Sequence, residues 1–309
     1  MKLKLIGLAA LAVMACLVVP VSAQGKAAPR KILIKEKQEV GLVVSEKTTE
    51  VNEERVTQSA GGNDSKFLGT ERNEQERTTE TLSLSEAGEV TDGRVTYLKD
   101  RKNKAQQGPE DVELSKEEES TGDLEGVTIR YTFDAKAGAF TAKLEKGESA
   151  KDTEDVVKAM RQKKPFTVPF IPNKEVEVGQ SWEVDETALR EFINPDEEKM
   201  KLAVVKATCK LEEITSTKAG EVAKVSFTLN ISGTGQHPNL GELEISGKNE
   251  GCYYFDLTTC HCTKVEMKAE FGFEKELETP QGKVKVTYKM TGTETKEFSY
   301  AKAEKKDGK

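Results

Sequence analysis

The sequence predicts a mainly β fold, with one or more large antiparallel sheets in meander order and a short helix between two β-rich halves. Apolar and polar residues alternate over long stretches, and in a strand this alternation places every second side chain on one face. Short segments containing glycine, asparagine or proline separate these stretches and indicate turns. Only 6% of the residues are aromatic and 33% are charged, so valine, isoleucine and leucine must supply most of the core.

The first segment of the chain, residues 1–23, is typical of a secretory signal peptide. Two lysines precede an apolar run over residues 5–19, and small residues end at Ala23, where cleavage is expected. The run is shorter than the roughly 20 apolar residues of a spanning helix, so we expect no transmembrane segment after its removal. Cys16 lies in a loose lipobox, which leaves lipid anchoring as the alternative. The expected location is the periplasm or the extracellular space.

The amino-terminal half, residues 24–150, carries a weaker strand pattern. Turns are expected at Gly61-Gly62, Asp92-Gly93 and Ala137-Gly138. Residues 103–124 are too polar to bury and predict a flexible acidic loop. The strands are expected near 31–44, 46–57, 65–72, 76–85, 93–101, 126–134 and 138–146.

A short helix is expected over residues 151–164. Val156, Val157 and Met160 fall at helical spacing, and Asp152 or Thr153 can cap the amino-terminal end. A proline at position 165 ends the helix.

The carboxyl-terminal half, residues 165–300, has the clearest period of two. In "VSFTLNIS", Val225, Phe227, Leu229 and Ile231 alternate with serine, threonine and asparagine. One face of this meander is therefore apolar, and the other presents lysine, glutamate and threonine to water. Residues 301–309 are expected to form a disordered tail. The five strands are expected near 201–214, 221–234, 241–257, 263–278 and 283–298.

The segment "IPNKEVEVGQSWEV" contains the only tryptophan, Trp182, just after a glycine turn, where it is expected to fill the core. This segment resembles the Pro/Val-Gly-x-x-Trp element of uncharacterised exported bacterial β-sheet proteins, and "YYFDLTTCHCTKVEM" resembles their aromatic–Asp–Leu turn. Such proteins are similar to curved-sheet carriers of the lipoprotein-localisation type. The resemblance implies a curved antiparallel sheet in the bacterial envelope and no catalytic residues. Cys260 stands where such turns have glycine, which adopts a left-handed conformation without strain.

Beyond the signal segment, the chain has four cysteines, and an even number in an oxidising compartment suggests disulfides. In the alternation of their strands, Cys209 falls on the apolar face and Cys252 on the opposite face, so no disulfide can join these two through the sheet. Cys252 is also too far along its strand from the turn to reach the other two. A strained Cys260–Cys262 bridge or free thiols remain. Cys260 and Cys262 are expected at an exposed hairpin tip.

The cluster Cys260-His261-Cys262 leaves three interpretations open: a hairpin tip, a thiol or disulfide site, and a metal site. Zinc favours a fourth ligand and paired CxxC spacing, which the sequence lacks. His237 lies in "GTGQHPNLG" and is expected in a loop, where a lone Gly-x-Gly does not indicate phosphate binding.

The composition and net charge disfavour several classes of function. A net charge of −7, with lysines interleaved among glutamates, disfavours nucleic acid as a partner. Two histidines and one tryptophan give little support for a hydrolase or a haem site, so we expect no enzyme activity and no cofactor. The sequence favours a structural or interaction protein of the envelope. The alternative is a carrier of a lipid or acyl chain, and its candidate binding residues are Val265, Met267, Phe271, Val286 and Tyr288.

Overall fold

The computed structural model describes residues 30–107, 117–147, 169–193, 200–237, 240–280 and 282–303. The expected signal peptide, Cys16 and the expected helix over 151–164 lie outside these residues. No helix in the described part of the chain has the length and apolar character needed to cross a membrane.

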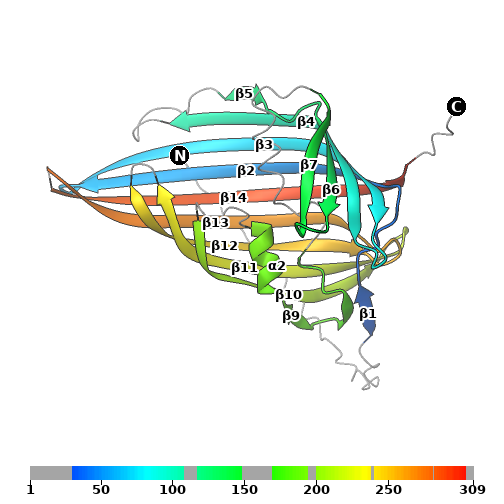
Figure 1. Cartoon of the computed structure of the whole chain (residues 1–309). Coiled ribbons are helices and arrows are strands. Elements are labelled where there is room, and N and C mark those ends of the chain that lie inside the picture. The colour runs from blue at the N-terminus through cyan, green and yellow to red at the C-terminus, as the bar shows by residue number, and fades with distance from the viewer. Residues whose placement is uncertain are drawn as a thin grey trace, which may run out of the picture. The chain divides into compact units, whose positions relative to one another are not determined.

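A large antiparallel sheet of 12 strands dominates the fold and confirms the mainly β class (Figure 1). Its neighbouring strands follow the order β7-β6-β4-β3-β2-β14-β13-β12-β11-β10-β9, and β5 pairs with β4. The amino-terminal strands are β2 (Leu42–Ala60), β3 (Asn63–Leu84), β4 (Val90–Gln107), β5 (Glu118–Thr121), β6 (Thr128–Asp134) and β7 (Ala139–Lys146). The carboxyl-terminal strands are β9 (Ser181–Glu183), β10 (Met200–Ser216), β11 (Glu221–His237), β12 (Gly241–Asp256), β13 (His261–Thr279) and β14 (Gly282–Lys302).

The two β-rich halves of the chain share this one sheet. The last strand, β14, pairs antiparallel with β2 from Val284 opposite Ala60 to Lys302 opposite Leu42. In Figure 1 the red β14 lies between the blue β2 and the orange β13. Residues far apart in the sequence therefore become neighbours on the same face of the sheet.

The strands of the carboxyl-terminal meander begin and end within a few residues of the expected positions. β14 continues to Lys302, so the expected tail over 301–309 begins too early. The extension is held by the ladder to Leu42 and by a 2.7 Å hydrogen bond from the Ala303 N–H to the Gly41 carbonyl. Residues 304–309 lie outside the described part.

Several expected boundaries in the amino-terminal half are wrong. The expected strand over 31–44 is interrupted, because β1 ends at Ile34 and β2 starts at Leu42. The expected breaks near Ser45 and Asn73 are absent. The polar residues there meet cross-strand partners: the Asn73 side-chain amide donates to Glu50 at 3.2 Å across to β2. Polar sequence at these positions marks a sheet ladder rather than a turn.

The expected acidic loop over 103–124 is also partly wrong. Its first residues complete β4, and Glu118–Thr121 form β5. Lys102 and Ser120 are opposite each other in that pairing. Residues 108–116 of the expected loop lie outside the described part.

A second, two-stranded sheet pairs β1 (Lys31–Ile34) with β8 (Lys174–Glu177). A short helix, α2 (Glu186–Ile193), follows β9 and was not expected from the sequence. The Asp185 carboxylate accepts a 2.9 Å hydrogen bond from the Ala188 N–H, which caps the helix. The Leu189 side chain is fully buried against β10 and β11, so packing compensates for the short length.

The main core lies on the apolar face of β10–β13, beneath the β1–β8 pair. It includes Cys209, Phe227 and Phe255 from the large sheet and Ile34 and Val176 from the small one. Trp182 is also in this cluster with 7% of its surface exposed, which confirms the expected core position.

Candidate functional site

The turn between β12 and β13 has the backbone strain that its sequence predicted. The Asp256 carboxylate accepts hydrogen bonds from the N–H groups of Thr258 at 2.7 Å and Thr259 at 2.9 Å. The Cys260 N–H closes the turn on the Asp256 carbonyl at 2.9 Å. Cys260 has φ of 62°, so a side chain occupies a conformation that favours glycine.

The expectation that Cys260 and Cys262 form an exposed tip is wrong. Cys262 is 3% exposed and His261 is 4% exposed, while Cys260 is half-buried. The segment between β1 and β2 lies over this turn, because the Lys37 N–H donates to the Cys260 carbonyl at 3.1 Å. The imidazole of His261 stacks on the ring of Tyr300, with centroids 4.1 Å apart.

The thiols are separate from one another. All four cysteines in the described residues are free, which confirms that Cys209 and Cys252 form no bridge. Cys209 is opposite Phe227, and Cys252 is opposite Ser226, so the two lie on opposite faces as their phase predicted.

The chemistry of this turn is restricted. Among the described residues, no three histidine, cysteine, aspartate or glutamate side chains are arranged to hold a metal ion. Burial raises the pKa of the Cys262 thiol to about 12, and that of Cys209 also to about 12. Thiolates are the reactive form, so both thiols are suppressed as nucleophiles. Burial lowers the pKa of His261, whose Nδ1 is buried without a hydrogen-bond partner among the described residues.

We expect a thiol reagent to modify Cys252 and Cys260 in the folded protein well before Cys209 and Cys262. The first two are half-buried and the last two are almost inaccessible, and access controls the reaction along with thiolate content. Mass spectrometry of alkylated peptides, with and without denaturant, measures the order. Early modification of Cys262 in the folded protein would contradict the covered turn.

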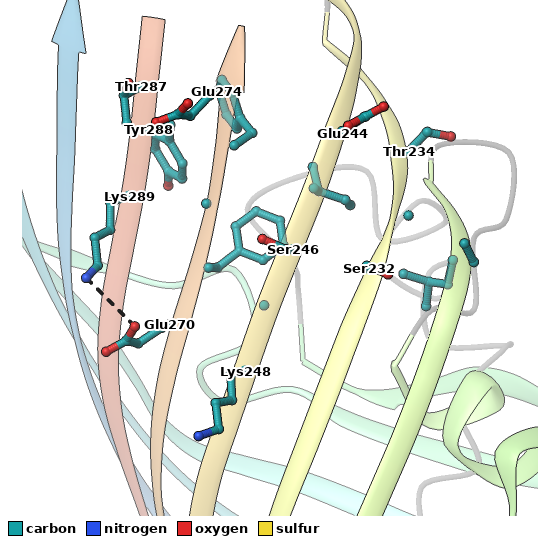
Figure 2. Close-up of a pocket in the computed structure, with 18 of the residues that line it drawn as sticks. Ser232, Thr234, Glu244, Ser246, Lys248, Glu270, Glu274, Thr287, Tyr288 and Lys289 are labelled. Atoms are coloured by element: carbon teal, nitrogen blue, oxygen red, sulfur yellow. Dashed lines mark ion pairs between the residues drawn. The ribbon is translucent and has the colours of Figure 1, made fainter.

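A large hollow lies elsewhere, along β10–β14 (Figure 2), with a volume of about 1010 Å³. Three strand glycines are in its lining: Gly233, Gly247 and Gly272. A Cβ at Gly247 would approach the Phe271 ring at 3.0 Å, and one at Gly272 would meet the Tyr288 carbonyl at 2.7 Å. Glycine is therefore required where neighbouring strands and rings approach this closely. The larger apolar residues of the lining are Leu202, Ile245, Phe271, Phe273 and Tyr288.

An apolar row crosses several strands at this position. Phe273 pairs with Tyr288, Tyr288 with Val56, and Val56 with Phe67, which places all four side chains on one face of β13, β14, β2 and β3. The rings of Phe273 and Tyr288 stack with centroids 5.1 Å apart. Phe67 is 39% exposed and the other three side chains are half-buried. We call these four residues the aromatic row.

The five candidate binding residues do not form one site. Phe271 and Tyr288 line the hollow. Val265 and Met267 pack against the main core, and Val286 is 5% exposed. Phe273 was missed as a site residue, although the same alternation that selected Phe271 includes it.

His237 is not in a loop. It is the last residue of β11 and pairs with Gly241 at the start of β12.

No protein-family model matches this chain, and no curated protein matches its sequence. A solved structure described as lipid–protein interactions in lipovitellin is similar at a TM-score of 0.45 and 10% identity, over 88% of this chain. This chain spans 27% of the length of that lipovitellin chain. The complex structure of Pseudomonas aeruginosa MucA/MucB is similar at a TM-score of 0.11 and 9% identity, over 78% of this chain and 88% of that one. Neither likeness is strong enough to bear on function, and the resemblance to exported bacterial proteins stays a prediction.

Proposed function

We propose that this protein is a non-enzymatic binding protein that holds a lipid or acyl chain on the apolar face of its large sheet. The observation that carries the proposal is the aromatic row beside the 1010 Å³ hollow. Binding sites for small molecules are concave and mostly lined by apolar and aromatic side chains. We propose further that the protein acts outside the cytoplasm, on the basis of the signal-like segment 1–23.

The apolar face has two parts with different roles. Over Cys209, Phe227 and Tyr253, the β1–β8 pair covers the sheet, and Trp182 from strand β9 completes this core. Tyr288, Phe273 and Phe67 retain solvent exposure. Apolar surface that stays exposed in this way is a favourable position for an apolar ligand, since its burial releases ordered water.

Binding of the neutral probe N-phenylnaphthylamine tests the proposal. We expect saturable fluorescence enhancement, and we expect Phe273→Thr to weaken binding about tenfold, because an aromatic contact contributes roughly 1–2 kcal/mol. The control is Val51→Thr, which changes an exposed apolar residue on the opposite face of β2. Both variants must unfold at the wild-type denaturant midpoint.

Two outcomes would contradict the proposal. One is the absence of saturable binding to the wild-type protein. The other is equal loss of affinity in the Phe273→Thr and Val51→Thr variants. Either result would favour a structural or interaction role for the sheet instead.

A further inference from the structure

We infer that the ligand is a cationic amphiphile, whose apolar body lies on the aromatic row and whose positive head lies at the carboxylate of Glu54. This inference rests on the proposed function and specifies the chemical class of its ligand. It follows from the charges that share the face of the aromatic row.

The lysines that line the hollow do not share that face. Lys289 follows Tyr288 in β14, and Lys248 follows Gly247 in β12, so strand alternation directs both away from the face of the aromatic row. Figure 2 shows Lys289 paired with Glu270, at 3.7 Å. These lysines are therefore poorly placed to bind the head group of a ligand that lies on the aromatic row.

Most basic side chains on the face of the aromatic row already have partners. Lys296 pairs with Glu294 at 3.0 Å, and Arg77 pairs with Glu46 at 2.6 Å. Lys275 lies on the same face, and its amine donates to the Glu242 carbonyl at 2.8 Å.

Glu50 and Glu54 differ from carboxylates of this face such as Glu46 and Glu294, which form ion pairs. The amides of Asn52 and Asn73 donate to Glu50 at 2.8 and 3.2 Å. Burial, and after it the nearby charge of Glu54, raises the pKa of Tyr288 to about 12. Among the described residues, no lysine or arginine forms an ion pair with Glu50 or Glu54.

Glu54 is the nearer of the two carboxylates to the aromatic row, because Glu50 is six residues from Val56, about 20 Å along β2. Glu54 is two residues from Val56 on the same face of β2, and it is opposite Met290 in β14. A positive head at Glu54 would lie beside the ring of Tyr288, where it gains a cation–π interaction as well as the carboxylate charge. A fatty-acid carboxylate in the same place would instead meet like charge.

A pair of fluorescent probes with the same alkyl chain tests the sign of the head group. One is a dansyl-labelled alkylamine and the other is a dansyl-labelled alkanoic acid. We expect the amine to bind about tenfold more tightly at low ionic strength, and the difference to shrink as salt is added.

Glu54→Gln should weaken binding of the amine about fivefold and leave binding of the acid unchanged or stronger. The control is Glu53→Gln, which removes the adjacent carboxylate on the opposite face, where it pairs with Arg55 at 2.7 Å. That control should leave both affinities unchanged. Phe273→Thr should weaken both probes equally.

The outcomes separate this inference from the proposed function. Tighter binding of the acid, with a loss in Lys275→Gln, would overturn the cationic assignment and retain an apolar ligand. Equal affinity for both probes, unchanged by Glu54→Gln, would also overturn the cationic assignment and retain an apolar ligand. Failure of the neutral probe and of both charged probes to bind would overturn the proposed function itself.

Discussion

Replacing Trp182 with alanine should lower the free energy of unfolding by about 3–5 kcal/mol, because the indole fills the main core. Trp182 lies on β9 opposite Cys209, and the residue is 7% exposed. Truncation leaves a cavity beneath the β1–β8 pair, which this core holds against the large sheet. Urea unfolding followed by far-UV circular dichroism measures the loss.

The indole also has a polar role that phenylalanine cannot replace. Its Nε1 donates to the Phe170 carbonyl at 3.4 Å, and the hydroxyl of Tyr253 donates to the same carbonyl at 3.3 Å. Trp182→Phe keeps most of the apolar volume, so we expect a smaller loss of about 1–2 kcal/mol. The wild-type protein should show the emission of a buried indole. Water-exposed emission in the folded state, or an unchanged midpoint in Trp182→Ala, would contradict the core position.

The carboxyl-terminal meander could be predicted because each of its strands has one apolar and one polar face. The alternation of Val225, Phe227 and Leu229 with polar residues is visible within a single strand, and burial of one face enforces it. The phases of Cys209 and Cys252 followed from the same pattern, and the structure places them on opposite faces as predicted.

Strands β2 and β3 were harder to predict, because most of their residues are polar on both faces. β3 extends over 22 residues, well beyond the usual strand, and its one buried residue is Thr81. Cross-strand contacts such as Glu46 with Arg77 satisfy the polar groups instead of a core. A sequence pattern that relies on burial cannot detect such a strand, which is why false breaks were expected at Ser45 and Asn73.

The candidate site depends on pairings between distant parts of the chain. The aromatic row exists because β14 pairs with β2, which brings Tyr288 beside Val56 and Phe67. The covered turn exists because the segment around Lys37 lies over Cys260. Local periodicity carries no information about either contact. The glycines inside the strands, such as Gly247 and Gly272, were the available signal of close strand approach.

Replacing Glu36 with glutamine should stabilise the protein at about pH 8 and change little at about pH 4. Glu36 belongs to the segment that covers the β12–β13 turn, and burial raises the pKa of its carboxyl to about 7. Its charge is also felt by the Cys262 thiol and the Tyr300 hydroxyl, whose pKa values it helps to raise. The folded state therefore favours the neutral carboxyl.

The sign of the pH dependence follows from the pKa of Glu36 in the unfolded chain and in the folded protein. Below the ordinary value of 4.5, the carboxyl is protonated in both states and does not disfavour folding. Between 4.5 and about 7 the unfolded chain ionises first, so stability falls as pH rises, and above about 7 the loss is constant. Glutamine cannot ionise, so Glu36→Gln should raise the free energy of unfolding by about 1–3 kcal/mol at high pH. This gain is smaller than the free energy equivalent to the full pKa shift, because the side chain is only half-buried.

The matched control is Glu39→Gln, in the same segment. Hydrogen bonding and charge from Lys37, with a contribution from Lys302, lower the pKa of Glu39, so its ionised form supports folding above the ordinary pKa. Its removal should not stabilise the protein at high pH. The pKa of His261 is lowered, so its protonation destabilises the folded protein as pH falls, whereas Glu36 destabilises it as pH rises. The comparison of variant with wild type at each pH cancels the contribution of His261, because both proteins contain it. Urea midpoints across this pH range test the prediction. A Glu36→Gln effect that is equal at low and high pH would mean that burial does not hold the carboxyl neutral in the folded protein.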